Sequence, residues 1–433
     1  MLAEFQTACL KNGTSVHMLS TQRFKTLTVR VYLQRRLEAV ANTRTALVMR
    51  LLSRGCDGWP TTRDLTRRFD SLYGSVMGTG VGKSGGLQLA HFHLETPAEQ
   101  YLPQRPSVGG PAIQTLGKVM TAPVIKDGAF PADATDQEVA YLARDIRGLI
   151  NDRTRYSVLR CTQEMCQDGP YGLSELGRLE DLDSVDPRNL YSHYQQLMAK
   201  GPMDVFAVGH LPPGIPELLA AALDFPRDPA PRETNHVAPR TRAGVREVLE
   251  ELDIAQARLC LGLRCYVPPA HPDYYALLMY DGILGGFPHS KLFVHVREEA
   301  GLAYDVWSFV SAALGFQYIV AGVHPAHYRQ ALEIIEHQRR QLADGSVSPH
   351  ELESTRAALI SRVKATRDSP SRLIGAAYSG LLTGRTESPE EQVAALSRVA
   401  LDDVVRVAGQ VQLDIIYLLA PEGGTEAASP GRQ

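Results

Sequence analysis

The sequence predicts an α+β protein made of two tandem homologous domains. A chain of 433 residues is too long to fold around one hydrophobic core. Strand-like segments alternate with helical ones along the chain, and the same order of segments occurs twice with an offset of 230 residues. Each domain is therefore expected to contain a mixed or antiparallel sheet packed with helices.

The repeat begins with a strand followed by a helix. In both copies apolar side chains occupy every second position of the first segment, which is typical of a strand. The paired segments are TLTVRVYLQ (26–34) and RLCLGLRCYV (258–267), then ANTRTALVMRLLSRG (41–55) and HPDYYALLMYDGILGG (271–286). We expect the first helix to begin at Asn42, a suitable N-cap, and to run to Gly55, with Gly285 as the matching stop.

The repeat continues to the end of each half. Each half contains a further strand, a long helix and a closing apolar strand. The pairs are LQLAHFHLE (87–95) with FQYIVAGVHP (316–325), EVAYLARDIRGLINDR (138–153) with ELESTRAALISRVKAT (351–366), and MDVFAVGHL (203–211) with LDIIYLLAP (413–421). Two domains of about 200 residues each follow from this order.

The domain boundaries are predicted from composition. A segment rich in proline and charge separates the two copies, which is typical of a linker. The last residues, GGTEAASPGRQ, have the composition of a disordered tail. We predict an N-terminal domain at 1–225, a linker at 226–243, a C-terminal domain at 244–422 and a disordered tail at 423–433.

Charge and cysteine content limit the kinds of partner and compartment. A net charge of −3 and a pI of about 6.5 provide no strong attraction to nucleic acid or to an anionic membrane, so neither partner is expected. The six cysteines show no disulfide framework, and no apolar run approaches the length of a membrane span. With no signal-peptide pattern at the start, we expect a cytoplasmic protein.

Two motifs that suggest ligand sites are rejected. GTGVGKS (78–84) lacks one residue of the phosphate-binding loop G-x-x-x-x-G-K-[ST] and leads into a strand, so we interpret it as a hairpin turn or bulge. The histidine pairs His91 with His93 and His324 with His327 have no third ligand at a suitable spacing. We therefore interpret them as ordinary histidines and not as metal ligands.

The most informative segment is HSKLFVHVREEAGLAY (289–304). It resembles the S-[RK]-L-F…R-E…G-L-x-Y motif of the insulinase, pitrilysin and mitochondrial processing peptidase superfamily, with Arg297 and Tyr304 at the positions of that motif's Arg and Tyr. The resemblance covers nearly the whole chain and implies two such domains forming half of a clamshell. It also implies that Arg297 and Tyr304 reach into a zinc site carried by the other half.

The zinc motif that the resemblance implies is missing from this chain. That motif is H-x-x-E-H on an early helix, where two imidazoles on one face converge on the metal and the Glu acts as general base. Matching the helix ends places Ala46, Met49 and Arg50 at the three positions. None of these side chains can act as a zinc ligand or as a base, so no metal is expected in this chain.

The position of the third zinc ligand has an acid. The family has a Glu seven residues after another acid, and Glu138 and Asp145 show this spacing, with Asp145 at the ligand position. Two acids on a solvated helix face are an equally simple interpretation, and Asp145 could instead pair with Arg50.

The retained residues favour a role in a two-chain enzyme. At the repeat offset Arg67 matches Arg297 but Gly74 replaces Tyr304, so only the second copy has both residues. Segments such as FKTLTVRVYL (24–33) and GFPHSKLFVHVRE (286–298) look most like inactive bacterial members paired with active ones. The resemblance thus implies a non-catalytic subunit whose Arg297 and Tyr304 bind and polarise an unfolded peptide or small protein at the zinc of an H-x-x-E-H partner subunit.

Two alternatives stay open at this point. One is a proteolytically inactive scaffold or peptide-binding protein, against which the retention of Arg297 and Tyr304 counts. The other is a self-sufficient peptidase with an unusual site, which the chemistry at residues 46–50 disfavours. A homodimer is a further possible assembly, and the sequence does not identify the substrate.

Overall fold

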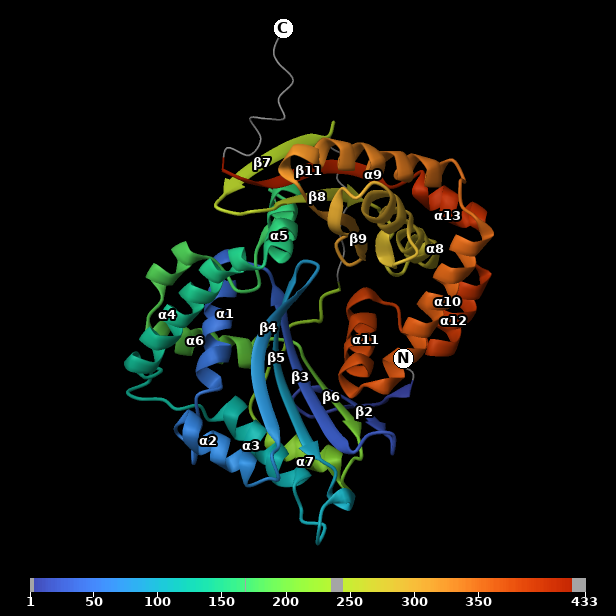
Figure 1. Cartoon of the computed structure of the whole chain (residues 1–433). Helices are drawn as coiled ribbons and strands as arrows, with labels where there is room; N and C mark the ends of the chain where they lie inside the picture. The colour runs from blue at the N-terminus through green and yellow to red at the C-terminus, as the bar shows by residue number, and fades with distance from the viewer. Residues whose placement is uncertain (1–3, 168, 235–243, 423–433) are drawn as a thin grey trace. The chain divides into compact units, whose positions relative to one another are not determined.

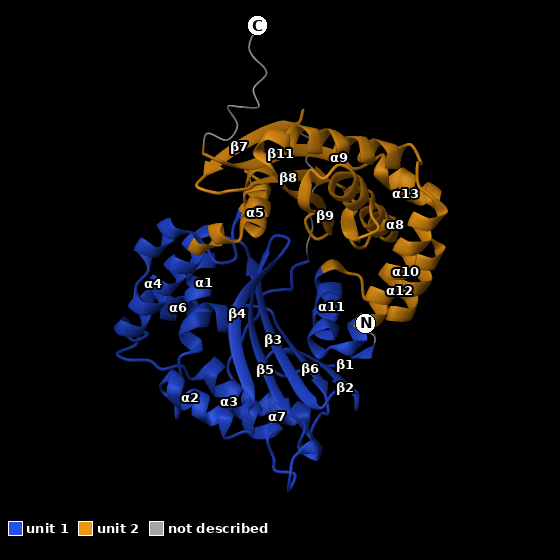
Figure 2. Ribbon diagram, in the orientation of Figure 1, with its two compact units in different colours: residues 1–147, 173–234, 366–382 blue, residues 148–172, 235–365, 383–433 orange. Residues whose placement is uncertain are grey.

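The computed structural model describes residues 4–167, 169–234 and 244–422, and they form an α+β protein with two sheets packed with helices (Figure 1). The chain divides into two compact units (Figure 2). Unit 1 comprises residues 1–147, 173–234 and 366–382, and unit 2 comprises residues 148–172, 235–365 and 383–433. The predicted fold class of two sheet-and-helix domains is confirmed.

Unit 1 is built on a mixed sheet whose strand order is β1-β2-β6-β3-β5-β4. Its central strand, β3, pairs antiparallel with β5 on one side and with β6 on the other. The strands are β1 (Gln6–Cys9), β2 (Ser15–Ser20), β3 (Thr26–Arg36), β4 (Val76–Ser84), β5 (Leu87–Pro97) and β6 (Met203–Gly209).

Helices of the N-terminal half cover one face of this sheet. Leu27, Val29, Val31 and Leu33 of β3 pack into a core with these helices. Side-chain caps begin several of the helices, such as the Asp186 capping box of α6. The helices are α1 (Ala39–Leu52), α2 (Thr62–Asp70), α3 (Gly109–Thr121), α4 (Ala132–Gly148), α6 (Pro187–Lys200) and α7 (Ile215–Ala222).

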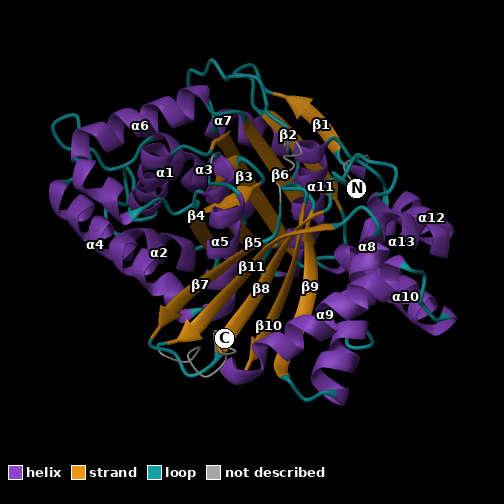
Figure 3. Ribbon diagram, turned by 90° about the horizontal axis from the view of Figure 1, so that it is seen from above, coloured by secondary structure: helices purple, strands orange, loops and turns teal. Residues whose placement is uncertain are grey.

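Unit 2 has a second mixed sheet, with the order β7-β11-β8-β10-β9, whose strands lie side by side in Figure 3. The strands are β7 (Arg246–Leu252), β8 (Ala257–Arg264), β9 (Ala303–Ser311), β10 (Phe316–Val323) and β11 (Gln412–Pro421). The helices are α8 (Tyr274–Asp281), α9 (Tyr328–Ala343), α10 (Pro349–Ala365), α12 (Pro389–Arg398) and α13 (Leu401–Ala408), with π-helical segments η6 (Gly282–Gly286) and η7 (Phe293–Glu299).

The two sheets share one topology, which confirms the internal repeat. In unit 1, β2 is parallel to β6, and β6, β3, β5 and β4 follow as antiparallel neighbours. In unit 2, β7 is parallel to β11, and β11, β8, β10 and β9 follow in the same way. Strands β3 and β8, which carry the clearest sequence copies, hold the same place in their sheets.

The compact units do not follow the chain halves at two segments, because each half contributes one helix to the other half's sheet (Figure 2). Helix α11 (Pro370–Thr383) covers the second face of the unit 1 sheet, where Tyr378 stacks on Tyr32 with ring centroids 4.0 Å apart. Helix α5 (Arg153–Met165) covers the second face of the unit 2 sheet, with Cys161 and Met165 packed among its strands.

Because of this exchange, the compact units are not the continuous ranges 1–225 and 244–422 that composition suggests. Each sheet has apolar side chains on both faces, so the second face also requires a helix, and the spacing of residues does not say which one. The predicted linker at 226–243 is described only as far as residue 234, and the predicted tail at 423–433 lies outside the described residues.

Two local predictions about α1 are corrected. The helix begins at Ala39 with Glu38 at the N-cap, and Asn42 lies within it, where its Oδ1 accepts a hydrogen bond from the Glu38 N–H (3.0 Å). Gly55 and Gly285 are required by close backbone packing and not by a left-handed cap. A Cβ on Gly55 would lie 2.5 Å from the Pro60 carbonyl carbon, and one on Gly285 would lie 2.7 Å from the Ser308 nitrogen.

Candidate functional site

The three positions of α1 that correspond to the zinc motif offer no open metal site. Ala46 and Met49 are buried, at 2% and 1% exposure. Arg50, one residue further, reaches α4: its Nε donates to Glu138 Oε2 (3.0 Å) and its Nη2 donates to Asp145 Oδ2 (2.9 Å). The pairing of Arg50 with Asp145 that the sequence suggested is therefore confirmed.

A second guanidinium completes this cluster of charges. Arg54, one helical turn after Arg50, donates from Nη1 to Glu138 Oε1 (2.8 Å). Both oxygens of the nearly buried Glu138 are thus bonded to arginines, and Asp145 is bonded to Arg50. Positive charge that a metal would supply to these acids is provided here by two side chains.

The donor chemistry of this corner does not fit zinc. Zinc requires several nitrogen, sulfur or oxygen donors that carry lone pairs, whereas Arg50 has only N–H donors and Ala46 has none. The two carboxylates are already engaged by arginines. Among residues 4–167, 169–234 and 244–422, no group of three or more His, Cys, Asp or Glu side chains is placed to hold a metal ion.

The segment that resembles the Arg/Tyr motif forms η7, a reversal and the start of β9. The helix ends at Glu299, and Gly301 turns the chain with a φ of +62°, a left-handed conformation that favours glycine. The Leu302 N–H then donates to Val296 O (3.0 Å), and β9 begins at Ala303. The helix thus ends between Arg297 and Tyr304.

The other residues of this motif hold the segment in place. The Lys291 ammonium binds Glu351 Oε1 of α10 (2.8 Å), and His289 Nε2 lies 3.0 Å from the Thr355 hydroxyl of the same helix. Burial opposes ionisation of Glu351, but the hydrogen bonds from Lys291 and Ser348 hold its pKa below the ordinary value. Leu292, which follows Lys291, is completely buried.

A buried acid, Asp281, holds strand β9 by hydrogen bonds. Asp281 Oδ1 accepts hydrogen bonds from the Ser308 hydroxyl (2.7 Å) and the Gln317 amide (2.8 Å). Burial raises the pKa of Asp281 to about 6, although both hydrogen bonds act in the opposite direction. Beside Tyr304, Asp305 is held by Arg258 Nη1 at 2.7 and 2.6 Å.

Arg297 and Tyr304 are both exposed, as are residues 298–301 between them. Tyr304 is 64% exposed, and Arg297 is exposed on η7 with its guanidinium 4.8 Å from the centroid of the Phe293 ring. Within the described residues, Arg297 forms no ion pair. The two side chains come from elements that pack together, η7 and β9, and no hydrogen bond joins them.

The rejected motifs have structural roles. GTGVGKS forms most of β4, an edge strand and not the predicted turn or bulge, and Thr79 donates to Met49 O of α1 (2.6 Å). His324 caps the short helix at 325–327 by accepting from the Ala326 N–H (3.2 Å). None of the six cysteines, all of which the structure describes, forms a disulfide. No described helix has the length and apolar character that a membrane crossing requires.

Comparison with known proteins agrees with this geometry. Residues 184–359 match a family model described as the Peptidase M16 inactive domain. A curated protein of Bacillus subtilis, "Probable inactive metalloprotease YmfF", is 30% identical over 423 residues, which cover 96% of this chain and 97% of that protein. The chain belongs to the M16 peptidase family, as a non-catalytic member.

Solved structures show the same M16 architecture. A conserved protein from Enterococcus faecalis V583 superposes with a TM-score of 0.88 at 25% identity, over 99% of this chain and 100% of that one. A peptidase M16 inactive domain from Pseudomonas fluorescens has the same fold, with a TM-score of 0.78 at 16% identity over 96% and 98% of the two chains.

Some residues of the candidate site were not found from the sequence. Arg54 was overlooked, although its position one turn after Arg50 places it on the same side of α1 toward α4. Lys291 and Ser308 were included only as letters of the motif, and their partners Glu351 and Asp281 lie far away in the sequence. No local signal identifies such partners.

Proposed function

We propose that this chain is the non-catalytic subunit of a heterodimeric zinc metallopeptidase. In this proposal the partner is a sister subunit with H-x-x-E-H, and Arg297 and Tyr304 bind and polarise the peptide substrate at the partner's zinc site. The substrate is an unfolded peptide or a small protein. Six cysteines without a disulfide among them support a cytoplasmic location for the complex.

One observation carries the proposal: residues around the motif are bonded within unit 2, while the side chains of Arg297 and Tyr304 are exposed. Lys291, Ser308 and Asp305 are each bonded within unit 2, whereas Arg297 has no acidic partner among the described residues and Tyr304 is 64% exposed. A residue with a purely structural role is expected to have a partner within its own chain. An exposed guanidinium and phenol on anchored elements are suited to a ligand instead.

The chemistry of the pair fits a peptide carbonyl. A guanidinium offers charge-assisted N–H donors, and each hydrogen bond to a charged group is worth about 1.5–3 kcal/mol. A phenol adds a neutral O–H donor. Both donors aimed at a carbonyl oxygen would stabilise the negative charge that develops there during hydrolysis. Loss of the charged guanidinium, the stronger donor of the two, is expected to cost roughly 100- to 1000-fold in turnover.

The test is peptide cleavage by a reconstituted pair of this chain and its zinc-bearing sister. Arg297→Ala is expected to lower turnover by roughly 100- to 1000-fold while the two chains still assemble. Arg297→Lys should rescue poorly, because an ammonium does not reproduce the planar fork of donors. Arg67→Ala is the matched control, since Arg67 is the exposed repeat counterpart of Arg297 and lacks a Tyr partner.

Equal turnover of the wild type and Arg297→Ala at matched assembly would contradict the proposal and favour the inactive scaffold. Tight zinc in the isolated chain would favour the self-sufficient peptidase. A stable homodimer that excludes the sister subunit would contradict the proposed heterodimer.

A further inference from the structure

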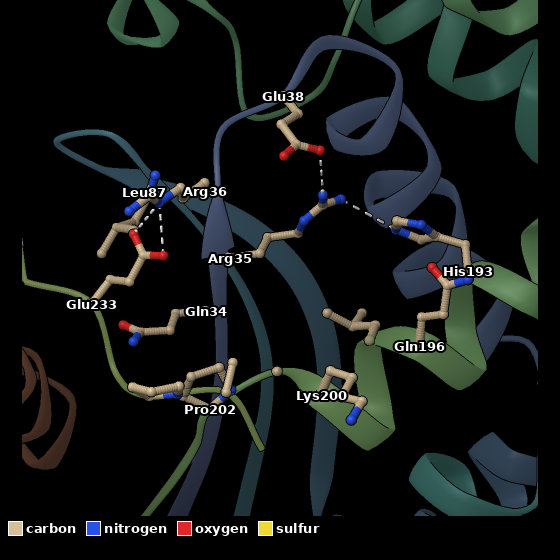
Figure 4. A pocket seen from close by; sticks show the side chains of 14 residues that line it. Gln34, Arg35, Arg36, Glu38, Leu87, His193, Gln196, Lys200, Pro202 and Glu233 are labelled. Carbon is tan, nitrogen blue, oxygen red and sulfur yellow. Dashed lines mark hydrogen bonds and ion pairs between the residues drawn. The ribbon is translucent and has the colours of Figure 1, made fainter. Parts of the chain in front are cut away.

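Unit 1 contains a cavity of about 320 Å³ at the place where strand β3 extends beyond the end of the neighbouring strand β6 (Figure 4). The pairing of β3 with β6 ends at Leu33 and Met203, and the Gln34 N–H donates to Pro202 O (3.2 Å) just before β6 begins. The space beside the last residues of β3 is bounded by α6 and by residues 230–233. Its size is within the range of small-molecule sites.

The amide of Gln34 is the unusual group in this cavity. Gln34 is 1% exposed, yet neither its Nε2 nor its Oε1 has a hydrogen-bond partner in the part of the chain that the structure describes. Figure 4 shows the Gln34 side chain leaving β3 between Glu233 and Pro202, which both line the cavity. Buried polar groups in folded proteins are almost always hydrogen-bonded, so an amide unpaired at both ends calls for an external partner.

A second buried glutamine in the same unit shows the contrast. Gln88 is fully buried, and its Nε2 donates to Asn42 O (3.0 Å) and Glu175 O (2.6 Å), whereas its Oε1, like that of Gln34, has no hydrogen-bond partner among the described residues. The sheet is therefore able to bind the donor end of a buried amide, and at Gln34 it does not. The donor and the acceptor of Gln34 are both left for a molecule that occupies the cavity.

The charges around the cavity are already balanced. Arg35 is paired with Glu38 (3.2 Å), and Arg36 with Glu233 (2.6 Å). Lys200 is paired with Asp228. Burial, with Arg35 and Arg44 nearby, lowers the pKa of His193 to about 4, so this side chain is neutral near pH 7. These pairs leave no cation dedicated to an anionic ligand.

We propose that this cavity binds a small neutral ligand that presents an N–H and a C=O side by side. The Gln34 Nε2 donates to the ligand carbonyl, and the Gln34 Oε1 accepts from the ligand N–H. Two kinds of molecule have this edge: one extended residue of a short peptide, and a primary carboxamide. Leu87, Leu197 and Pro231 supply the apolar part of the wall. The site is independent of Arg297 and Tyr304.

The experiment titrates the full chain with N-acetylalanine methylamide and with nicotinamide, followed by saturation-transfer NMR and thermal shift. We expect at least one probe to bind and to raise the melting temperature, and Gln34→Leu to weaken that binding at least tenfold. The probe that binds distinguishes the peptide source from the carboxamide source. Gln338→Leu is the control, because Gln338 is buried in unit 2 with an unpaired Oε1 and is not part of this cavity.

Two outcomes would overturn the proposal: neither probe binds the wild-type chain, which would leave a cavity that holds only water, or a probe binds the wild type and Gln34→Leu equally well. If Gln34→Leu does not fold, Gln34→Glu tests the same contact. It keeps the size of the side chain and, when ionised, retains acceptors but loses the donor, so it should also weaken binding at least tenfold.

Discussion

The corner at α1 in unit 1 and the motif at η7 and β9 in unit 2 belong to homologous halves, yet they have opposite characters. At α1, the arginine that replaces a ligand is bonded to two acids of α4, and its neighbours are buried. At η7 and β9, Arg297 and Tyr304 are exposed on a segment that other residues hold. At α1 the charged side chains pair with one another within the chain. At η7 and β9 the side chains of Arg297 and Tyr304 stabilise no contact of this kind.

The largest expected effect comes from restoring the zinc motif. Placing His, Glu and His at 46, 49 and 50 removes Arg50, which binds Asp145 and is one of two arginines on Glu138, and puts an imidazole where Ala46 is buried. Overpacking costs about 1–3 kcal/mol, and with the lost ion pair we expect about 4 kcal/mol of destabilisation in urea. Calorimetry should show no tight zinc binding, because the Asp145 side chain is one methylene shorter than the Glu that the zinc motif uses as its third ligand. Tight binding would contradict the closed-site interpretation.

A smaller effect is expected from the acid beneath β9. The pKa of Asp281 is raised by burial from 3.8 to about 6. Its stabilising contribution is therefore complete below about pH 4 and is lost as the pH rises through 6. Each unit of pKa difference is worth about 1.4 kcal/mol, so this loss is at most about 3 kcal/mol.

Asp281→Asn stays neutral and should not lose stability in this pH range. The free energy of unfolding of Asp281→Asn relative to the wild type should thus rise by up to about 3 kcal/mol between pH 4 and pH 7, measured by urea denaturation. Parallel pH profiles for the two proteins would show that Asp281 titrates normally.

Arg50→Ala tests whether the α1 corner is structural. Breaking a buried ion pair costs about 3–5 kcal/mol, but the Arg50 side chain is 31% exposed and Arg54 still binds Glu138. We expect a loss of about 2 kcal/mol in urea denaturation. Arg297→Ala should change stability by no more than about 0.5 kcal/mol, as an exposed residue does. Equal losses of unfolding free energy in both variants would contradict the proposed difference between the α1 corner and the η7–β9 motif.

The smallest effect is expected at Tyr304. Tyr304→Phe removes one neutral hydrogen-bond donor, worth about 0.5–1.5 kcal/mol, so the mixed complex should lose roughly up to tenfold in turnover. Peptide cleavage with the sister subunit measures this loss. A decrease as large as that of Arg297→Ala would indicate that the phenol does more than donate a hydrogen bond.

Much of the fold was predictable because it rests on local periodicity. The alternating apolar positions of β3 and β8 and their repeat offset predicted two similar sheets, and the topologies agree. The exchange of α5 and α11 was not predictable, because hydrophobic spacing shows that a helix has an apolar side but not which sheet it covers. Asn42 misled the prediction because its side chain bonds to the Glu38 N–H from within the helix.

The candidate site was predictable where a motif fixes the residues. Arg50 with Asp145 followed from the resemblance together with simple charge pairing. Asp281 and Gln34 were not found, because their significance comes from burial and from partners that are distant or absent. Such properties arise only when segments far apart in the chain meet.

The exchange of α5 and α11 affects how the chain can be divided. A fragment that stops after the N-terminal half lacks α11, and the face of its sheet with Tyr32 and Phe206 would then be open to water. The complementary fragment lacks α5 and exposes Tyr318 and Tyr417 in the same way. Each half of the chain thus supplies one helix to the core of the other half, so the two halves are expected to melt together. Separately expressed halves are expected to aggregate unless they are mixed.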